Sequence, residues 1–182
     1  ARAAGVASII TLPNGTPITR PSNFTILCED IIRRTEKGLA KCLVSDSILG
    51  RPSEDGPQVQ PCLSSGLWDA GAGISVGGQH VANWLIGQVR DGTQTEEDML
   101  RYAKEIGADG TAFVEAFKQV PCMSRERFEQ VAQALYSLAK QLSDIAYQNV
   151  QQARFIRDAE MAEDQLRQLR NYLSNIINSM PS

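Results

Sequence analysis

The C-terminal third of this chain contains neither of the two residues that most strongly interrupt a helix. Glycine and proline are both absent from residues 124–179, whereas the first 90 residues hold 11 of the 14 glycines and all but two of the eight prolines. Both residue types are unfavourable in a helix interior. The sequence therefore predicts a mixed segment of strands and helices, followed by one helix from Ser124 to about residue 178, which at 1.5 Å per residue spans roughly 80 Å.

Hydrophobic periodicity and turn residues divide the first part of the chain into short elements. The expected strands cover residues 6–12, 16–19, 58–63, 70–76 and 80–89, and the expected helices cover residues 23–34, 36–49, 93–107 and 109–120. Asn14-Gly15 and Gly77-Gly78 are typical of hairpin turns, and the spacing of Thr93 and Glu96 fits a helix-capping box. The economical packing is an α+β domain, with a five-stranded antiparallel sheet and helices on one face.

The long C-terminal helix carries two heptad-like series of apolar residues. They are Phe128, Val131, Leu135, Leu138, Leu142 and Ile145, and then Ala159, Ala162, Leu166, Leu169, Leu173, Ile176 and Met180. Because the two series do not join in phase, the heptad frame breaks between about residues 149 and 159. We expect the first series to pack on the domain and the second to pair in a parallel homodimer. A helix folded back on itself is the alternative, but neither glycine nor proline marks a turn.

This pattern predicts two parts, a domain over residues 1–145 and a coiled-coil signalling helix over residues 146–182. The sequence ends near Pro181, a helix-stop residue, as if a further domain should begin there. A net charge of −3 predicts no general attraction to nucleic acid or to an anionic membrane. No apolar run approaches the length of about 18 residues that would span a bilayer. Four widely spaced cysteines are typical of reduced thiols in a cytoplasmic protein.

The sequence contains one string that resembles an enzyme motif. Residues 73–77 read Gly-Ile-Ser-Val-Gly, but the nucleophile elbow needs Ser75 on a strand-to-helix turn, with an acid and then a histidine later in the chain. The only histidine, His80, follows five residues later without an intervening acid. No phosphate-binding loop and no two-histidine zinc motif is present. We therefore expect no catalytic residue in this fragment.

The cysteines allow two interpretations. Cys28 and Cys42 lie on apolar faces of expected helices, and Cys62 lies beside an expected strand. Three thiols could converge on a metal ion or an iron–sulfur centre. However, no Cys-x-x-Cys pair is present, and a buried cysteine is also a good small hydrophobic residue. We favour packing or pocket lining without a cofactor, and keep a metal or redox sensor as the alternative.

Two segments go beyond composition. The first reads Pro-Ile-Thr-Arg-Pro-Ser-Asn-Phe-Thr over residues 17–25, and is followed by Cys28, Cys42 and Ser45-Asp46. The second comprises residues 62–74, with Trp68-Asp69-Ala70-Gly71, and residues 82–89, which read Ala-Asn-Trp-Leu-Ile-Gly-Gln-Val. Over about residues 5–145 the chain resembles the PocR sensory domain, a PAS-like variant found ahead of kinase, PAS and transcription-regulator modules. Residues 148–156 and 171–181 look like the linker that precedes a PAS domain in sensor histidine kinases.

The resemblance implies a PAS-like input domain of a bacterial two-component sensor histidine kinase. It also implies that a small hydrocarbon derivative, such as a diol, an alcohol or a short acid, is bound without turnover. Many relatives have Cys-His-Ala-Gly-Leu where this chain reads Cys-Leu-Ser-Ser-Gly-Leu over residues 62–67. The histidine is absent and the spacing is one residue longer, so the identity of the ligand does not carry over.

The second segment also makes sense as the lining of a pocket. Polar and aromatic side chains are costly to bury unless they have partners, and two aromatic walls with a few polar groups suit a small, partly apolar ligand. The expected ligand-binding residues are Phe24, Cys28, Cys62, Trp68, Asp69, Asn83, Trp84 and Gln88. The alternative is that the tryptophans are ordinary core and that Asp69 or Asn83 only satisfies the backbone of a turn. A bound ligand would shift or rotate the long helix.

Overall fold

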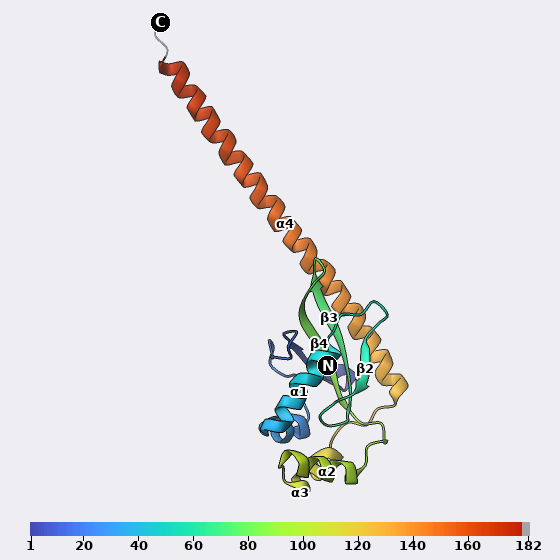
Figure 1. Cartoon of the computed structure of the whole chain (residues 1–182). Coiled ribbons are helices and arrows are strands. Elements are labelled where there is room, and N and C mark those ends of the chain that lie inside the picture. The colour runs from blue at the N-terminus through green and yellow to red at the C-terminus, as the bar shows by residue number, and fades with distance from the viewer. Residues whose placement is uncertain (180–182) are drawn as a thin grey trace. The chain divides into compact units, whose positions relative to one another are not determined.

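The computed structural model describes residues 1–179 and contains a four-stranded antiparallel sheet (Figure 1). The strands are β1 (Ala7–Thr11), β2 (Gln58–Pro61), β3 (Trp68–Val76) and β4 (Gln79–Val89), and their order across the sheet is β1-β4-β3-β2. The expected hairpin at Gly77-Gly78 joins β3 to β4, and Ala72 lies opposite Trp84 in that pair. The α+β class and the long C-terminal helix are confirmed.

The predicted fifth strand over residues 16–19 does not form. Within the described residues the only β-bridge of this segment joins Pro17 to Thr11, and a second isolated bridge, between Ser8 and Ser22, lies beyond it. Proline lacks the N–H that a ladder requires. In addition, the Thr19 hydroxyl accepts the Ile10 N–H at 3.0 Å and so replaces a backbone acceptor. The segment therefore lies along β1 without continuing the sheet.

The expected helix over residues 23–34 is replaced by two short and irregular turns. They are η2 (Leu27–Ile31), which is a π-helix, and η3 (Ile32–Arg34), which is a 3-10 helix. Asn23 does not cap a helix, because it has a left-handed backbone (φ 58°) while its side-chain amide donates to the Val6 carbonyl at 3.1 Å. Single π turns are frequent at functional sites.

The other helices of the domain agree with the sequence pattern. α1 (Glu36–Leu49) begins after Thr35, whose hydroxyl accepts the Gly38 N–H, and α3 (Gly110–Lys118) begins after Asp109. α2 (Glu96–Ile106) is capped by Thr95 rather than by Thr93. The reason is that the Thr93 hydroxyl donates to Asp91 at 2.6 Å and is used in the preceding turn.

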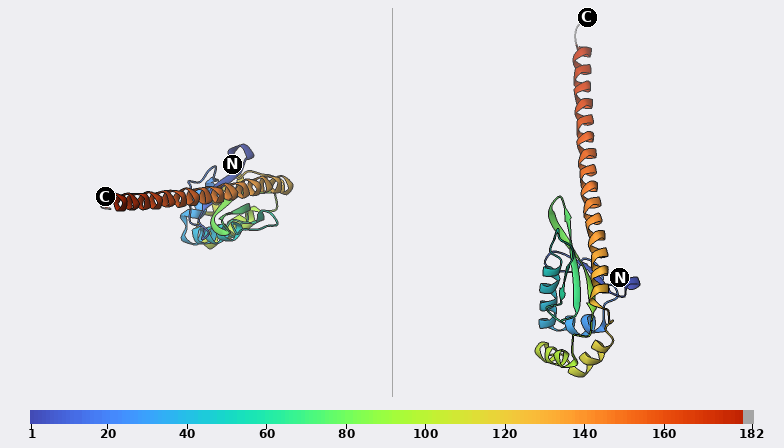
Figure 2. Two further views of the ribbon diagram at one scale, coloured as in Figure 1. Left: turned by 90° about the horizontal axis from the view of Figure 1, so that it is seen from above. Right: turned by 90° about the vertical axis from the view of Figure 1, so that its right-hand side faces the viewer.

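Helices cover both faces of the sheet, not one face as expected (Figure 2). On one face, α1 lies so close to β3 that a Cβ atom at Gly71 would meet the backbone of Leu49. On the other face lies the first part of α4 (Arg125–Ser179), whose buried positions follow a helical spacing of four and three residues. These positions are Phe128, Ala132, Leu135 and Ala139, which pack with Ala70, Ala72, Ile74, Ile86 and Val89 of the sheet.

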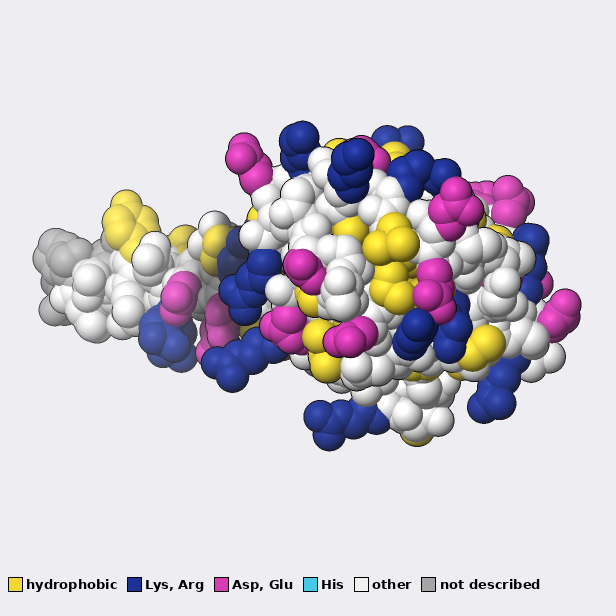
Figure 3. Space-filling view, turned by 90° about the horizontal axis from the view of Figure 1, so that it is seen from below, with side chains coloured by type: hydrophobic (Ala, Val, Ile, Leu, Met, Phe, Trp, Pro, Cys, Tyr) yellow, Lys and Arg dark blue, Asp and Glu magenta, His cyan; other side chains and the backbone are white. Residues whose placement is uncertain are grey.

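A separate hydrophobic cluster joins α2 and α3 to η2, around Leu27, Tyr102 and Phe113. The outer surface of the domain at this end carries interspersed acidic and basic side chains with small hydrophobic patches between them (Figure 3). Such a mixed surface agrees with the small net charge of the chain.

The chain divides into two compact units, Ala1–Ser143 and Asp144–Ser182, and α4 runs through the boundary. In the second unit nearly every described side chain is exposed, including Phe155 at 75% and Leu166 at 68%. Met180 and Pro181, on which the end of the heptad series and the expected helix stop depend, lie outside the described residues. Within residues 1–179 no helix is both long and apolar enough to cross a membrane.

Candidate ligand-binding site

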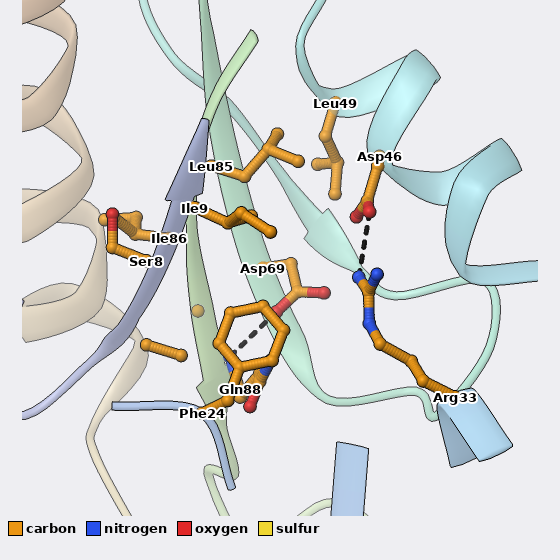
Figure 4. Close-up of a pocket in the computed structure, with 12 residues that line it drawn as sticks. Ser8, Ile9, Phe24, Arg33, Asp46, Leu49, Asp69, Leu85, Ile86 and Gln88 are labelled. Atoms are coloured by element: carbon orange, nitrogen blue, oxygen red, sulfur yellow. Dashed lines mark hydrogen bonds and ion pairs between the residues drawn. The ribbon is translucent and has the colours of Figure 1, made fainter. Parts of the chain in front are cut away.

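A cavity of about 30 Å³ lies between the sheet and the segment that includes η3 and α1 (Figure 4). Its apolar wall is built by Ile9, Phe24, Leu49 and Leu85. Its polar groups are Arg33, Asp46, Asp69 and Gln88, which come from four different elements or loops. A water molecule needs roughly 10–15 Å³ measured in this way, so the cavity admits only a small ligand.

Arg33 and Asp46 form an ion pair at the cavity, with 2.8 Å between the guanidinium and the carboxylate. The same guanidinium lies 5.3 Å from the centre of the Phe24 ring, a cation–π distance. Burial raises the pKa of Asp46, and the attraction of Arg33 offsets part of that rise. The Nε atom of Arg33 is buried and has no hydrogen-bond partner among the residues that the structure describes. A buried N–H without a partner is costly, so this atom is a donor that a ligand could satisfy.

Asp69 is the second carboxyl group at the cavity. Its Oδ1 atom accepts the Gln88 N–H at 2.8 Å, and its other oxygen points away from Gln88 into the space between sheet and helix (Figure 4). Among the described residues Asp69 takes part in no ion pair, because Arg33 is committed to Asp46. Burial raises the pKa of Asp69 from 3.8 to about 7, more than the hydrogen bond from Gln88 lowers it. Both protonation states of Asp69 are therefore populated near neutral pH.

Gln88 enters the cavity through an irregularity in β4. The pairing of β3 with β4 passes from Trp68–Val89 to Asp69–Gly87, so Gln88 is an extra, bulged residue. Its backbone is left-handed (φ 60°), and its side-chain carbonyl accepts the Thr25 N–H at 2.8 Å and the Thr25 hydroxyl at 3.0 Å. A Cβ atom at Gly87 would overlap the Asp69 carboxylate. Glycine at position 87 therefore permits the close approach on which the site depends.

Of the expected site residues, the structure brings Phe24, Asp69 and Gln88 together at this cavity. It does not bring the two tryptophans there. Trp84 points to the face that α4 covers and donates its indole N–H to the Ser8 hydroxyl at 3.0 Å. Trp68 packs against the same cluster, with the Arg125 guanidinium 4.9 Å from its ring. Alternate residues of a strand point to opposite faces, so Trp68 and Asp69 face different sides of the sheet.

The remaining expected residues lie in other surroundings. Asn83 is fully buried, and its amide donates to the Leu12 carbonyl at 2.9 Å, which ties the end of β1 to β4. Cys28 packs in the cluster of α2 and α3, where burial raises the pKa of its thiol to about 12. Cys62 lies between β2 and β3, beside a separate depression of about 430 Å³ that includes Tyr102. The expected set is therefore divided between the cavity, the core and this depression.

The cysteine alternative receives no support from the structure. Within residues 1–179, no three histidine, cysteine, aspartate or glutamate side chains gather in a way that could hold a metal ion. Cys28 and Cys42 are both buried in the hydrophobic cluster around Leu27.

Sequence reasoning missed Arg33 and Asp46 as parts of the site. One signal was present for Asp46, because it lies on the same side of its helix as Cys42 and Leu49, where a charged residue is unusual. Arg33 gave no comparable signal. Its place at the cavity depends on the short turns that replace the expected helix.

The domain thus has a small cavity on one face of its sheet and the first part of α4 on the other face. A family model described as the sensory domain found in PocR matches residues 1–147, so the chain belongs to that family. No curated protein and no solved structure matches the chain. A sensory domain binds rather than catalyses, in agreement with the expectation of no catalytic residue in this chain.

Proposed function

We propose that this domain senses a small, uncharged molecule that carries one or two hydroxyl groups. The proposal depends mainly on the buried Nε atom of Arg33, a donor with no partner among the described residues. Arg33 lines a cavity that also contains the Asp69 carboxyl group. A hydroxyl group can accept a hydrogen bond from the first and donate one to the second. The apolar wall of Phe24, Leu49 and Leu85 suits a short hydrocarbon chain. Short alcohols and diols combine both properties.

The charges of the cavity disfavour short acids. Two carboxyl groups, Asp46 and Asp69, face one guanidinium group, and Arg33 is already paired with Asp46 at 2.8 Å. A ligand carboxylate would add a negative charge without a free cation to balance it, which is costly in a buried site. The volume of about 30 Å³ restricts the ligand to a few heavy atoms.

A thermal-shift comparison of three-carbon compounds tests this function. We expect 1,2-propanediol at saturating concentration to raise the Tm by about 5 °C or more, and sodium propanoate to leave it unchanged. Leu85→Phe, which fills the cavity, should abolish the shift, whereas Val81→Phe, at a 38% exposed position of the same strand, should keep it. The proposal is wrong if short diols and alcohols give no shift, or if Leu85→Phe responds as the wild type does.

We propose that α4 transmits the signal of this sensor, because a bound ligand favours one of two packings of α4 on the sheet. We further propose that this chain is the input part of a cytoplasmic sensor histidine kinase of a bacterial two-component system. A preference of about 1–3 kcal/mol between the two states would give a useful response. The exposed apolar residues of the second unit would pair with those of a second copy in a parallel coiled coil.

The proposed coiled coil predicts a concentration-dependent dimer. Leu166→Glu with Leu173→Glu would place charges in the seam, at positions that are 68% and 50% exposed in the single chain. We expect sedimentation equilibrium to show a dimer for the purified chain and a monomer for this double variant. Gln168→Glu, outside the seam, should remain dimeric. A wild-type chain that stays monomeric at tens of micromolar, and so associates by less than about 6 kcal/mol, would overturn the dimer.

A further inference from the structure

The C-terminal end of β4 contacts both the cavity and the start of α4. Gln88 lines the cavity, and Arg90 follows two residues later. The Arg90 N–H donates to the Pro121 carbonyl at 2.9 Å, and the Arg90 carbonyl accepts the Met123 N–H, also at 2.9 Å. Met123 immediately precedes Ser124, whose hydroxyl accepts the Arg127 N–H in the first turn of α4. The backbone that forms the cavity edge is thus hydrogen-bonded to the residues that begin the helix.

The bulge at Gln88 is held in a conformation that few residues adopt. Among the described residues, only Asn23 and Gln88 combine a side chain with a positive φ. Such backbone persists when its surroundings hold it in place, and it is concentrated at functional and switching sites. At Gln88 the restraints are the Asp69 carboxylate on its N–H and Thr25 on its side-chain carbonyl. Both restraints lie at the cavity, where a ligand would compete with them.

The bulge also decides which side chain points to which face. In a regular strand Gln88 would share the face of Trp84 and Ile86, which α4 covers. The extra residue turns Gln88 to the cavity and places Val89 in the cluster that contains Met123 and Phe128. Loss of the bulge would therefore disturb the contacts of α4 at its first turns.

A second contact reaches the same end of α4. Trp68 is paired with Val89 across the strands and directly precedes Asp69. Its ring lies 4.9 Å from the guanidinium of Arg125, the first residue of α4. A shift of the backbone at Trp68 and Asp69 would therefore also reach Arg125.

From these contacts we infer that the Gly87–Gln88 bulge is the coupling element between the cavity and α4. A ligand that takes over the hydrogen bonds of Asp69 or Gln88 changes the position of Val89 and Arg90, and with them Met123 and the first turn of the helix. The identity of the ligand rests on the proposed function. The coupling between the bulge and α4 does not rest on it, because the contacts that form this coupling lie within the domain.

The other contact of α4 with the β3–β4 hairpin serves as an internal comparison. There the Ser75 N–H donates to the Ser143 hydroxyl at 3.0 Å, near the tip of the hairpin and with neither residue at the cavity. If the bulge is the coupling element, changes at Gln88 should alter the contacts at the start of α4 and leave the hydrogen bond between Ser75 and Ser143 unchanged.

Amide hydrogen exchange read by NMR on the whole chain tests the link without a ligand. Gln88→Gly removes the side-chain carbonyl that accepts hydrogen bonds from Thr25. Glycine also adopts a positive φ without strain, so the bulge loses both this restraint and its backbone strain. We expect exchange of the Arg90, Met123 and Phe128 amides to become about fivefold to tenfold faster, as the loss of a hydrogen bond predicts. The Ser75 amide should be unchanged. Gln94→Gly is the matched control, because its side chain also holds a loop, through the Gly66 carbonyl at 3.2 Å.

The outcomes separate the coupling from the proposed function. If Gln88→Gly accelerates exchange only at residues 25–31 and leaves Met123 and Phe128 unchanged, the coupling is wrong, whatever the domain binds. Where Gln88→Gly does not fold, Gln88→Asn, which tolerates a left-handed backbone, is compared in its place. Addition of 1,2-propanediol to the wild type should alter exchange at Met123 and Phe128, and should alter it less in the variant. Binding of the diol with equal changes in both proteins would also overturn the coupling, whereas absence of binding contradicts only the proposed ligand.

Discussion

Replacement of Asp69 with asparagine is expected to raise the free energy of unfolding at pH 8 by up to about 4 kcal/mol, and to change it little below pH 4. A pKa raised from 3.8 to about 7 corresponds to about 1.4 kcal/mol for each pH unit between the two values. The figure is an upper bound, because Asp69 keeps partial exposure in the structure. Asparagine preserves the shape and the acceptor for the Gln88 N–H, but it cannot ionise.

The direction of the effect follows from proton binding. Between pH 4 and pH 7 the folded protein holds the Asp69 proton while the unfolded chain releases it, so wild-type stability falls as pH rises through this range. Urea unfolding of both proteins from pH 4 to pH 8 measures the difference. Asp91→Asn serves as a control that should lower the free energy of unfolding, because hydrogen bonds from Thr93 lower the pKa of Asp91 and so favour its ionised form in the folded protein. A difference between wild type and Asp69→Asn that stays constant over this range would show that Asp69 ionises freely in the folded protein.

The elements that depend on local sequence were predictable. The interval without glycine or proline forms α4, and the helix expected from Asp109 begins after that residue. The errors occur where a side chain takes the hydrogen bond of a backbone group. The Thr19 hydroxyl replaces a strand partner, and the Asn23 amide helps to hold a left-handed turn. Such substitutions depend on contacts with β1 and with Val6 just before it, which periodicity does not describe.

The segments of the site were predictable, but their orientations were not. Period-two alternation separates Trp68 from Asp69, and its use would have removed the tryptophans from the expected pocket. The same rule would have assigned Gln88 to the wrong face, because the bulge at Gly87–Gln88 reverses the alternation. The pairing of Arg33 with Asp46 joins residues 13 positions apart, one in the irregular turn η3 and the other in α1. Neither the bulge nor this pair has a distinctive pattern in the sequence.

Replacement of Phe128 with alanine is expected to lower the free energy of unfolding by about 3–5 kcal/mol, the usual cost of removing a buried phenylalanine. Phe128 is 1% exposed and packs with Val89 and Met123, beside the coupling bulge. Phe155→Ala, at a position that is 75% exposed in the second unit of the same helix, should change stability by less than about 0.5 kcal/mol. Urea unfolding followed by tryptophan fluorescence measures both, since Trp68 and Trp84 lie on the face that α4 covers.

The comparison between these two phenylalanines tests how α4 is attached to the domain. If Phe128 holds the start of the helix against the sheet, Phe128→Ala should also accelerate exchange of the Arg90 and Met123 amides, because they share the cluster and the hydrogen bonds at that end. The cavity residues Phe24 and Leu49 lie on the opposite face and should keep their packing. A loss of stability below about 1 kcal/mol, far from the cost of a buried aromatic residue, would mean that α4 does not depend on this contact. The helix could not then report the state of the sheet through its first turns.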